Sequence, residues 1–127
     1  MKENRITVVI NKPLGEVFEF TTNPKNTHLW VPFISEEVSS EYPPKVGTIY
    51  KSCRENGIWS EMKVVEFKNN EEFVLSDLDE KLFVKYIYRN LDDNKTEMEY
   101  SDWMIDKNFK SPITKNVLDA LKKVMEK

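Results

Sequence analysis

The sequence predicts an α+β fold, in which a curved antiparallel sheet of about six or seven strands holds a C-terminal helix in its concave face. Three observations support this prediction. The chain opens with a strand pattern followed by two short helix patterns. Residues 34–105 then alternate between strand patterns and polar turns with no helical pattern between them, which is typical of an antiparallel meander and not of βαβ units. Residues 113–125 return to helical spacing.

The first thirty residues predict one strand and two short helices. Apolar residues alternate from Ile6 to Ile10, which buries one face of a strand. Pro13 has its φ preset for a first helical turn, where its missing N–H is not needed. The helix that follows has an apolar stripe formed by Leu14, Val17, Phe18 and Thr21. Asn23 is suited to cap a second short helix with Pro24 at its first position.

The middle of the chain predicts six strands, over residues 34–42, 47–55, 58–67, 73–76, 82–90 and 96–105. Asn56-Gly57 is the strongest hairpin signal, because both residues tolerate positive φ. The terminal helix is predicted from a cap at Ser111 with Pro112 in the first turn. Its apolar stripe contains Ile113, Val117, Leu121 and Val124.

Composition limits the classes of function. The 127 residues suit one domain over residues 1–127, and the net charge of −3 is scattered with no basic block, so we expect no nucleic-acid binding. No run of about twenty apolar residues is present to span a bilayer. Cys53 is alone, which excludes an intramolecular disulfide. With no secretory apolar region after the charged N-terminus, we expect a cytoplasmic protein.

Several short motifs resemble the START-like, or SRPBCC, superfamily, in particular its polyketide cyclase/dehydrase branch. They are Ile10-x-x-Pro13, Val17-Phe18, Asn23-Pro24, Trp30 and Val46-Gly47-Thr48. With the order of elements, the resemblance spans essentially the whole chain. It implies a helix-grip fold around a cavity for apolar ligands. Lys12 replaces the small residue usual before the proline, and the terminal helix is short for the group. We therefore expect a cavity that is shallow, open or closed by a second subunit in a homodimer.

Aromatic residues on the predicted strands indicate what such a cavity would bind. Tyr86 and Tyr88 share one strand face, and Tyr100 shares another with Asp102. If these faces point inward, the interior is mostly apolar with a few hydroxyls and one carboxylate, as a pocket for a small hydrophobic or amphipathic molecule requires. The alternative is that the tyrosines simply fill the core. The expected ligand contacts are Trp30, Phe33, Tyr50, Met62, Tyr86, Tyr88, Tyr100 and Leu121.

Two other functions are open at this stage. The first is a cyclase, dehydratase or hydrolase acting on a polyketide-like or aromatic substrate, with Asp102 or His28 as base and Tyr86 or Tyr100 as proton donor. The sequence shows no convincing dyad, so this hypothesis ranks below ligand binding. The second is a co-chaperone-like interaction domain, because some members of the superfamily regulate a heat-shock ATPase. It predicts an exposed apolar patch around Trp59 and Phe67.

Metal and cofactor sites are not expected. One His and one Cys cannot form an ordinary structural zinc site. The acidic clusters Asp77/Asp79/Glu80 and Asp92/Asp93 coincide with predicted turns, where Asp side chains bond their own backbone. The sequence contains no phosphate-binding glycine loop and no nucleophile elbow.

Overall fold

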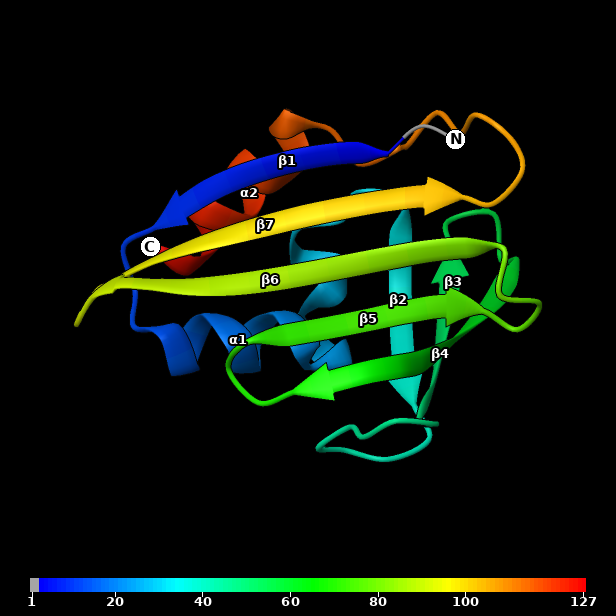
Figure 1. Cartoon of the computed structure of the whole chain (residues 1–127), viewed down its shortest axis with the longest axis horizontal. Helices are drawn as coiled ribbons and strands as arrows, with labels where there is room; N and C mark the ends of the chain where they lie inside the picture. Colours follow the sequence, from blue (N-terminus) through cyan, green and yellow to red (C-terminus); the bar gives the residue numbers. More distant parts are fainter. Residues whose placement is uncertain (1–2) are drawn as a thin grey trace.

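The computed structural model describes residues 3–127, which form a seven-stranded antiparallel sheet in the order β1-β7-β6-β5-β4-β3-β2. The strands are β1 (Asn4–Ile10), β2 (Ile34–Ser39), β3 (Ile49–Arg54), β4 (Trp59–Lys68), β5 (Glu72–Asp77), β6 (Leu82–Asp92) and β7 (Lys95–Met104). The helices are α1 (Leu14–Thr22), the 3₁₀ helix η1 (Pro24–Leu29) and α2 (Lys115–Met125). Figure 1 shows all three helices on one side of the sheet, while β2 and β3 cross behind the other strands at a steep angle.

The helices cover the concave face, and the core lies between them and the sheet. Alternation along β1 buries Val8 and Ile10, while α2 buries one stripe formed by Val117, Leu118, Leu121 and Met125. This arrangement confirms the predicted α+β fold, with its curved antiparallel sheet, two short helices after the first strand and a C-terminal helix in the concave face.

Local sequence signals correctly predicted one helix cap and one hairpin turn. The Asn23 side chain accepts a hydrogen bond from the Lys25 N–H at 3.0 Å, so it caps η1 with Pro24 in the first turn. Gly57 has φ +84° in the loop between β3 and β4. A glycine adopts this left-handed conformation without a Cβ clash, which lets the hairpin close at the predicted position.

The start of the terminal helix differs from the prediction. The helix begins at Lys115, with Thr114 in the N-cap position, and not at Pro112. Ser111 is not its cap, because the Ser111 hydroxyl accepts from the Ile113 N–H at 3.0 Å and donates to Asp102 at 2.5 Å. The Ser111 side chain therefore bonds Asp102 on β7 and does not form the helix cap that the local pattern had predicted.

The expectation that Trp59 and Phe67 share one exposed apolar patch is wrong, because β4 contains a register shift. Val64 pairs with Leu75 and Glu66 pairs with Val74, so one extra residue separates them. The shift turns Phe67 to the concave side, where its ring lies 5.6 Å from that of Phe18, whereas Trp59 stays exposed.

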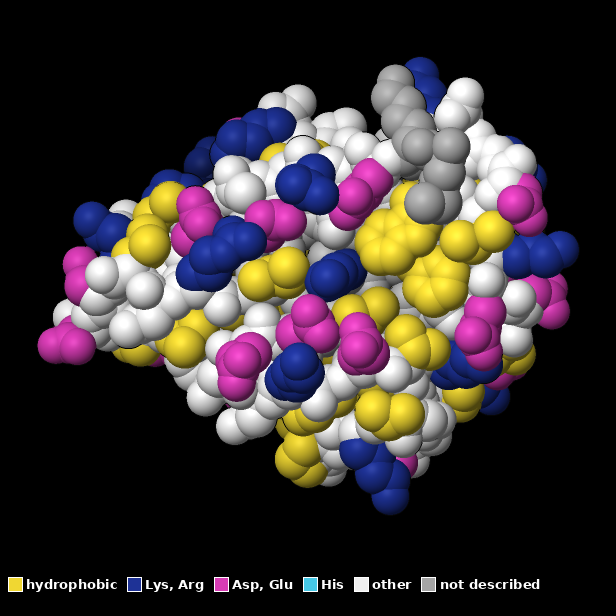
Figure 2. All heavy atoms as spheres, in the orientation of Figure 1, with side chains coloured by type: hydrophobic (Ala, Val, Ile, Leu, Met, Phe, Trp, Pro, Cys, Tyr) yellow, Lys and Arg dark blue, Asp and Glu magenta, His cyan; other side chains and the backbone are white. Residues whose placement is uncertain are grey.

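The convex face of the sheet is covered largely by charged side chains. Arg89 bonds Glu97 at 3.0 Å and Glu99 at 2.8 Å, as expected for a solvated outer surface. Figure 2 shows acidic and basic side chains intermixed over the middle of this face, with apolar side chains gathered over the ends of β6 and β7. There Phe83 and Trp103 stack with ring centroids 5.4 Å apart. Within residues 3–127, no helix has the length and apolar character needed to cross a membrane.

Candidate functional site

The concave face brings together several of the predicted ligand contacts. The register pairs Tyr86 with Tyr100 and with Phe73, and it pairs Tyr50 with Met62. The ring centroids of Tyr86 and Tyr100 lie 5.4 Å apart, and those of Phe73 and Tyr86 lie 5.8 Å apart. The strand alternation therefore forms one continuous aromatic cluster on the inner face of the sheet.

Burial divides the eight predicted contacts into two groups. The buried group belongs to the core and consists of Trp30, Tyr50, Tyr88, Tyr100 and Leu121. Phe33, Met62 and Tyr86 are only partly buried and pack against this core. Among the eight predicted contacts, the side chains that keep some exposed surface for a ligand are therefore those of the second group.

Two tyrosine hydroxyls hold α1 against the sheet. The Tyr50 hydroxyl donates to the Thr22 carbonyl at 2.6 Å, and the hydroxyls of Tyr88 and Thr21 lie 2.7 Å apart. Both contacts are buried, and both join a strand to the last turn of α1. These two tyrosines thus have a structural role that the sequence pattern did not distinguish from ligand contact.

Tyr86 differs from these tyrosines, because its hydroxyl makes no hydrogen bond within residues 3–127. Burial raises its pKa well above the ordinary value, and the nearby ionisable groups Tyr88, Glu37 and Asp102 raise it further. The hydroxyl is therefore protonated at neutral pH. It lies on the inner face as a hydrogen-bond donor that the described part of the chain leaves unused.

Asp102 supplies an unused acceptor on the neighbouring strand. Its side chain is 2% exposed. Its Oδ2 accepts from the Tyr100 hydroxyl at 2.7 Å and from Ser111 at 2.5 Å, while Oδ1 has no partner among residues 3–127. Trp30 Nε1 is likewise buried without an acceptor in that range. A buried polar group without a partner costs about 1–3 kcal/mol, so these atoms are candidates for ligand contact.

Glu37 on β2 is a site residue that the sequence analysis missed. Its two carboxylate oxygens accept from Thr27 of η1 and Ser52 of β3, each at 2.5 Å. Burial raises the pKa of this carboxyl, and the two hydrogen bonds oppose that rise. The segment 34–42 reads as a polar strand, so only its pairing with Ser52 reveals that Glu37 points inward.

We expect Glu37→Gln to change how stability depends on pH. The folded pKa lies above the ordinary 4.5, so this carboxyl stabilises the fold most below pH 4.5 and loses that contribution as pH rises through the folded pKa. Glutamine does not titrate. The free energy of unfolding of the variant relative to wild type should therefore rise between about pH 4 and about pH 7. Urea unfolding at both pH values measures this change. The same difference in the exposed neighbour Glu36→Gln would contradict the assignment.

The other candidate residues lie elsewhere or show no partner. His28 is exposed on η1, and it makes no ion pair or hydrogen bond to a side chain within residues 3–127. Cys53 is a free, partly buried thiol on β3. In the described range, no group of three or more His, Cys, Asp or Glu side chains is placed to hold a metal ion.

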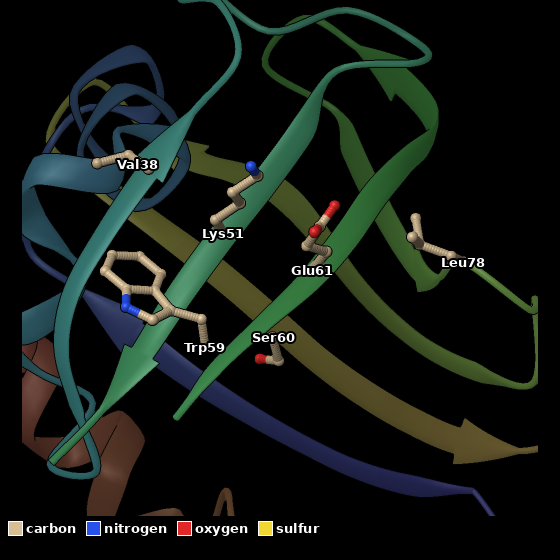
Figure 3. Close-up of a pocket in the computed structure, with 6 residues that line it drawn as sticks. All are labelled: Val38, Lys51, Trp59, Ser60, Glu61 and Leu78. Atoms are coloured by element: carbon tan, nitrogen blue, oxygen red, sulfur yellow. The ribbon is translucent and has the colours of Figure 1, made fainter. Parts of the chain in front are cut away.

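Three open surface hollows stand out among residues 3–127, and none of these three is lined by Tyr86 or Tyr100. One of about 570 Å³ lies between the start of β1 and residues 109–115, and its lining includes Ser111, the partner of Asp102. Another of about 580 Å³ lies on the convex face beside Trp59 (Figure 3). An enclosed cavity beneath the tyrosines, as the resemblance implied, is not among them.

The curved sheet closed by a C-terminal helix defines a helix-grip fold of the START type, and solved structures support this class. A START superfamily protein from Mycobacterium smegmatis is similar over 98% of this chain and 97% of its own, at 13% identity and a TM-score of 0.73. The Aha1 dimer from Colwellia psychrerythraea matches over 98% and 90%, at 13% identity and a TM-score of 0.64. An uncharacterised protein from Bacillus thuringiensis matches over 99% and 100%, at 10% identity and a TM-score of 0.74.

These likenesses establish the fold alone, because the sequence identities are low. No family model and no curated protein matches the sequence. Fold similarity does not specify function, so the function has to be argued from the residues of the inner face.

Proposed function

We propose that this protein binds a small amphipathic molecule against the middle of its concave face. The observation that supports this most is the set of polar groups left without a protein partner there. The hydroxyl of the partly buried Tyr86 offers a donor. The buried Asp102 Oδ1 offers an acceptor. A ligand with an apolar body and a hydroxyl at one end would satisfy both, because a hydroxyl donates and accepts.

The position of the helices supports an approach over the central strands. The helix α2 packs against β1, η1 packs against β2, and α1 packs against β6 and β7, where Thr21 contacts Tyr88. The remaining part of the central strands carries the partly buried apolar side chains Met62, Val84 and Tyr86. Covering these side chains with an apolar ligand would contribute about 25 cal/mol for each Å² removed from water. Binding is then driven by apolar burial and oriented by the two polar groups.

The resemblance adds weight to this proposal. This chain shares a START-like fold with the mycobacterial protein. Placement in the polyketide cyclase/dehydrase branch, a single domain over residues 1–127 and cytoplasmic residence remain part of the proposal. The Colwellia relative was solved as a dimer, which supports the expectation of a homodimer.

The proposal is tested by native mass spectrometry of freshly purified protein. Wild-type protein should carry a copurified small molecule, identified by its mass difference from the denatured chain. Tyr86→Phe keeps the ring but removes the hydroxyl, so it should retain that molecule about three- to tenfold less well, as expected for one lost hydrogen bond. Tyr42→Phe is the matched control, because Tyr42 is 42% exposed and its hydroxyl makes only a 3.4 Å contact, with the Glu19 carbonyl.

A negative result has a clear form. If wild-type protein carries no small molecule, and if a panel of hydroxylated aromatic and aliphatic compounds fails to raise its melting temperature, the ligand-binding proposal is wrong. Equal retention by Tyr86→Phe and wild type would remove Tyr86 from the site.

An acid–base enzyme is the second candidate, and Glu37 is the observation that favours it. A carboxyl whose pKa is raised by burial lies close enough to Tyr86 to affect the pKa of its phenol. General acid–base catalysis uses groups tuned in this way. If the copurified molecule, or an aromatic polyketide-like compound, is converted by the wild type and not by Glu37→Gln, while both proteins bind it, the enzyme hypothesis is preferred.

A further inference from the structure

The second feature of interest is the hollow on the convex face, formed by β2, β3, β4 and the loop after β5. Its lining consists of Val38, Lys51, Trp59, Ser60, Glu61 and Leu78. Figure 3 shows the Trp59 indole extending beside β2 and β3, with Lys51 and Glu61 on the adjacent strands β3 and β4. Trp59 is 48% exposed and Leu78 is 53% exposed. All three helices lie on the other side of the sheet, so none of them covers these side chains.

The charges of Lys51 and Glu61 in this hollow are unpaired within residues 3–127, unlike those of Lys63, Lys85 and Arg89 on β4 and β6. Lys51 and Glu61 are register partners on β3 and β4, yet neither forms an ion pair with any residue from 3 to 127. The next lysine on the same face of β4, Lys63, bonds Glu80 at 2.6 Å. The hollow thus combines exposed apolar surface with one free positive and one free negative charge.

We propose that this hollow is the centre of an interface with a second copy of the same chain. A two-fold axis passing between Lys51 and Glu61 would bring the lysine of each copy to the glutamate of the other. The surface is then self-complementary, as a two-fold interface requires. Trp59 lines the same hollow, so it lies within the proposed interface.

The chemistry of the residues suits this role. Interfaces are enriched in Trp at their centres, and one tryptophan buries about 150–250 Å². A stable dimer buries about 800 Å² on each partner. In the proposed interface, the apolar centre consists of Trp59, Leu78 and Val38, and the surrounding strand residues form the rim. This inference concerns a face opposite the ligand site; it rests on the homodimer of the proposed function and not on ligand binding.

A charge-exchange experiment tests the proposal by analytical ultracentrifugation over a range of protein concentrations. Wild type should dimerise. Lys51→Glu and Glu61→Lys each place like charges across the axis, so each variant alone should dimerise at least tenfold more weakly. An equal mixture of the two variants should form a heterodimer with near wild-type affinity, because every contact then joins opposite charges. The double variant Lys51→Glu/Glu61→Lys should also recover dimerisation.

Truncation of the aromatic residue gives a second measurement. Trp59→Ala should weaken the dimer on the order of thirtyfold, as expected for a central aromatic contact. Two controls should leave it unchanged: Leu91→Ala, which removes an exposed apolar side chain near the end of β6, and Lys123→Glu, which reverses an exposed charge on α2. Circular dichroism of each variant confirms that it is folded.

Three outcomes would overturn the proposal. They are a wild type that stays monomeric at every concentration, a dimer that neither Trp59→Ala nor Lys51→Glu weakens, and a mixture of the charge variants that fails to associate. A monomer that instead captures an unrelated protein through Trp59 also counts against a second copy as the occupant.

Discussion

Replacing Leu121 with alanine is expected to lower the free energy of unfolding by about 3 kcal/mol. The side chain has no exposed surface, and it lies in the middle of the buried stripe of α2. The substitution removes its transfer free energy and leaves a cavity between helix and sheet that the surrounding strands can fill only in part. The packing of α2 into the concave face would be loosened as a whole.

Urea unfolding followed by circular dichroism measures this loss. Val46→Ala is the matched control, because Val46 is 60% exposed and its truncation should change stability by less than about 0.5 kcal/mol. A loss of less than about 1 kcal/mol for Leu121→Ala would mean that α2 is not held in the concave face in solution.

Replacing Asp102 with alanine is expected to cost about 2–3 kcal/mol, since two donors lose their acceptor at once. The hydroxyls of Tyr100 and Ser111 both donate to Asp102 Oδ2. The Ser111 contact also ties the segment before α2 to β7, so that segment should become more accessible to proteases. Denaturant unfolding and limited proteolysis provide the two measurements.

Asp102→Asn separates the structural role of this residue from its proposed contact with ligand. The amide oxygen can still accept from Tyr100 and Ser111, so the variant should lie within about 1 kcal/mol of the wild type. The amide nitrogen then replaces the unpartnered Oδ1 and offers a donor where the ligand needs an acceptor. Retention of the copurified molecule should fall about tenfold. Unchanged retention would exclude Oδ1 from the site.

The fold could be predicted from the sequence because the patterns that indicate its strands, helices and turns are local and periodic. Alternation in β1, β6 and β7 placed Val8, Tyr86 and Tyr100 on buried or inward faces, as the register shows. The helical stripe predicted α2, and Asn56-Gly57 predicted the hairpin between β3 and β4. In the strands and the helix, the period of the apolar residues determines which side chains share a face. This holds independently of which residues those side chains contact in the folded protein.

The candidate site could be predicted from the sequence only in part. Strand alternation identified the inward tyrosines, but it could not tell that Tyr50 and Tyr88 would be used to hold α1 while Tyr86 would not. Glu37 was missed, because an inward carboxylate in a polar strand is visible only through its partners Thr27 and Ser52. Hydrogen bonds between residues far apart in the chain decide these roles.

Periodicity and turn residues were therefore sufficient for the class of fold, the order of its elements and the inward face of most strands. Three features could be recognised only from the tertiary structure. They are the register shift that turns Phe67 inward, the hydrogen bond from Ser111 to Asp102, and the lack of ion-pair partners for Lys51 and Glu61 within residues 3–127. The reason is that a pattern specifies which face a side chain occupies, whereas its partner and its access to solvent depend on segments that only folding brings together.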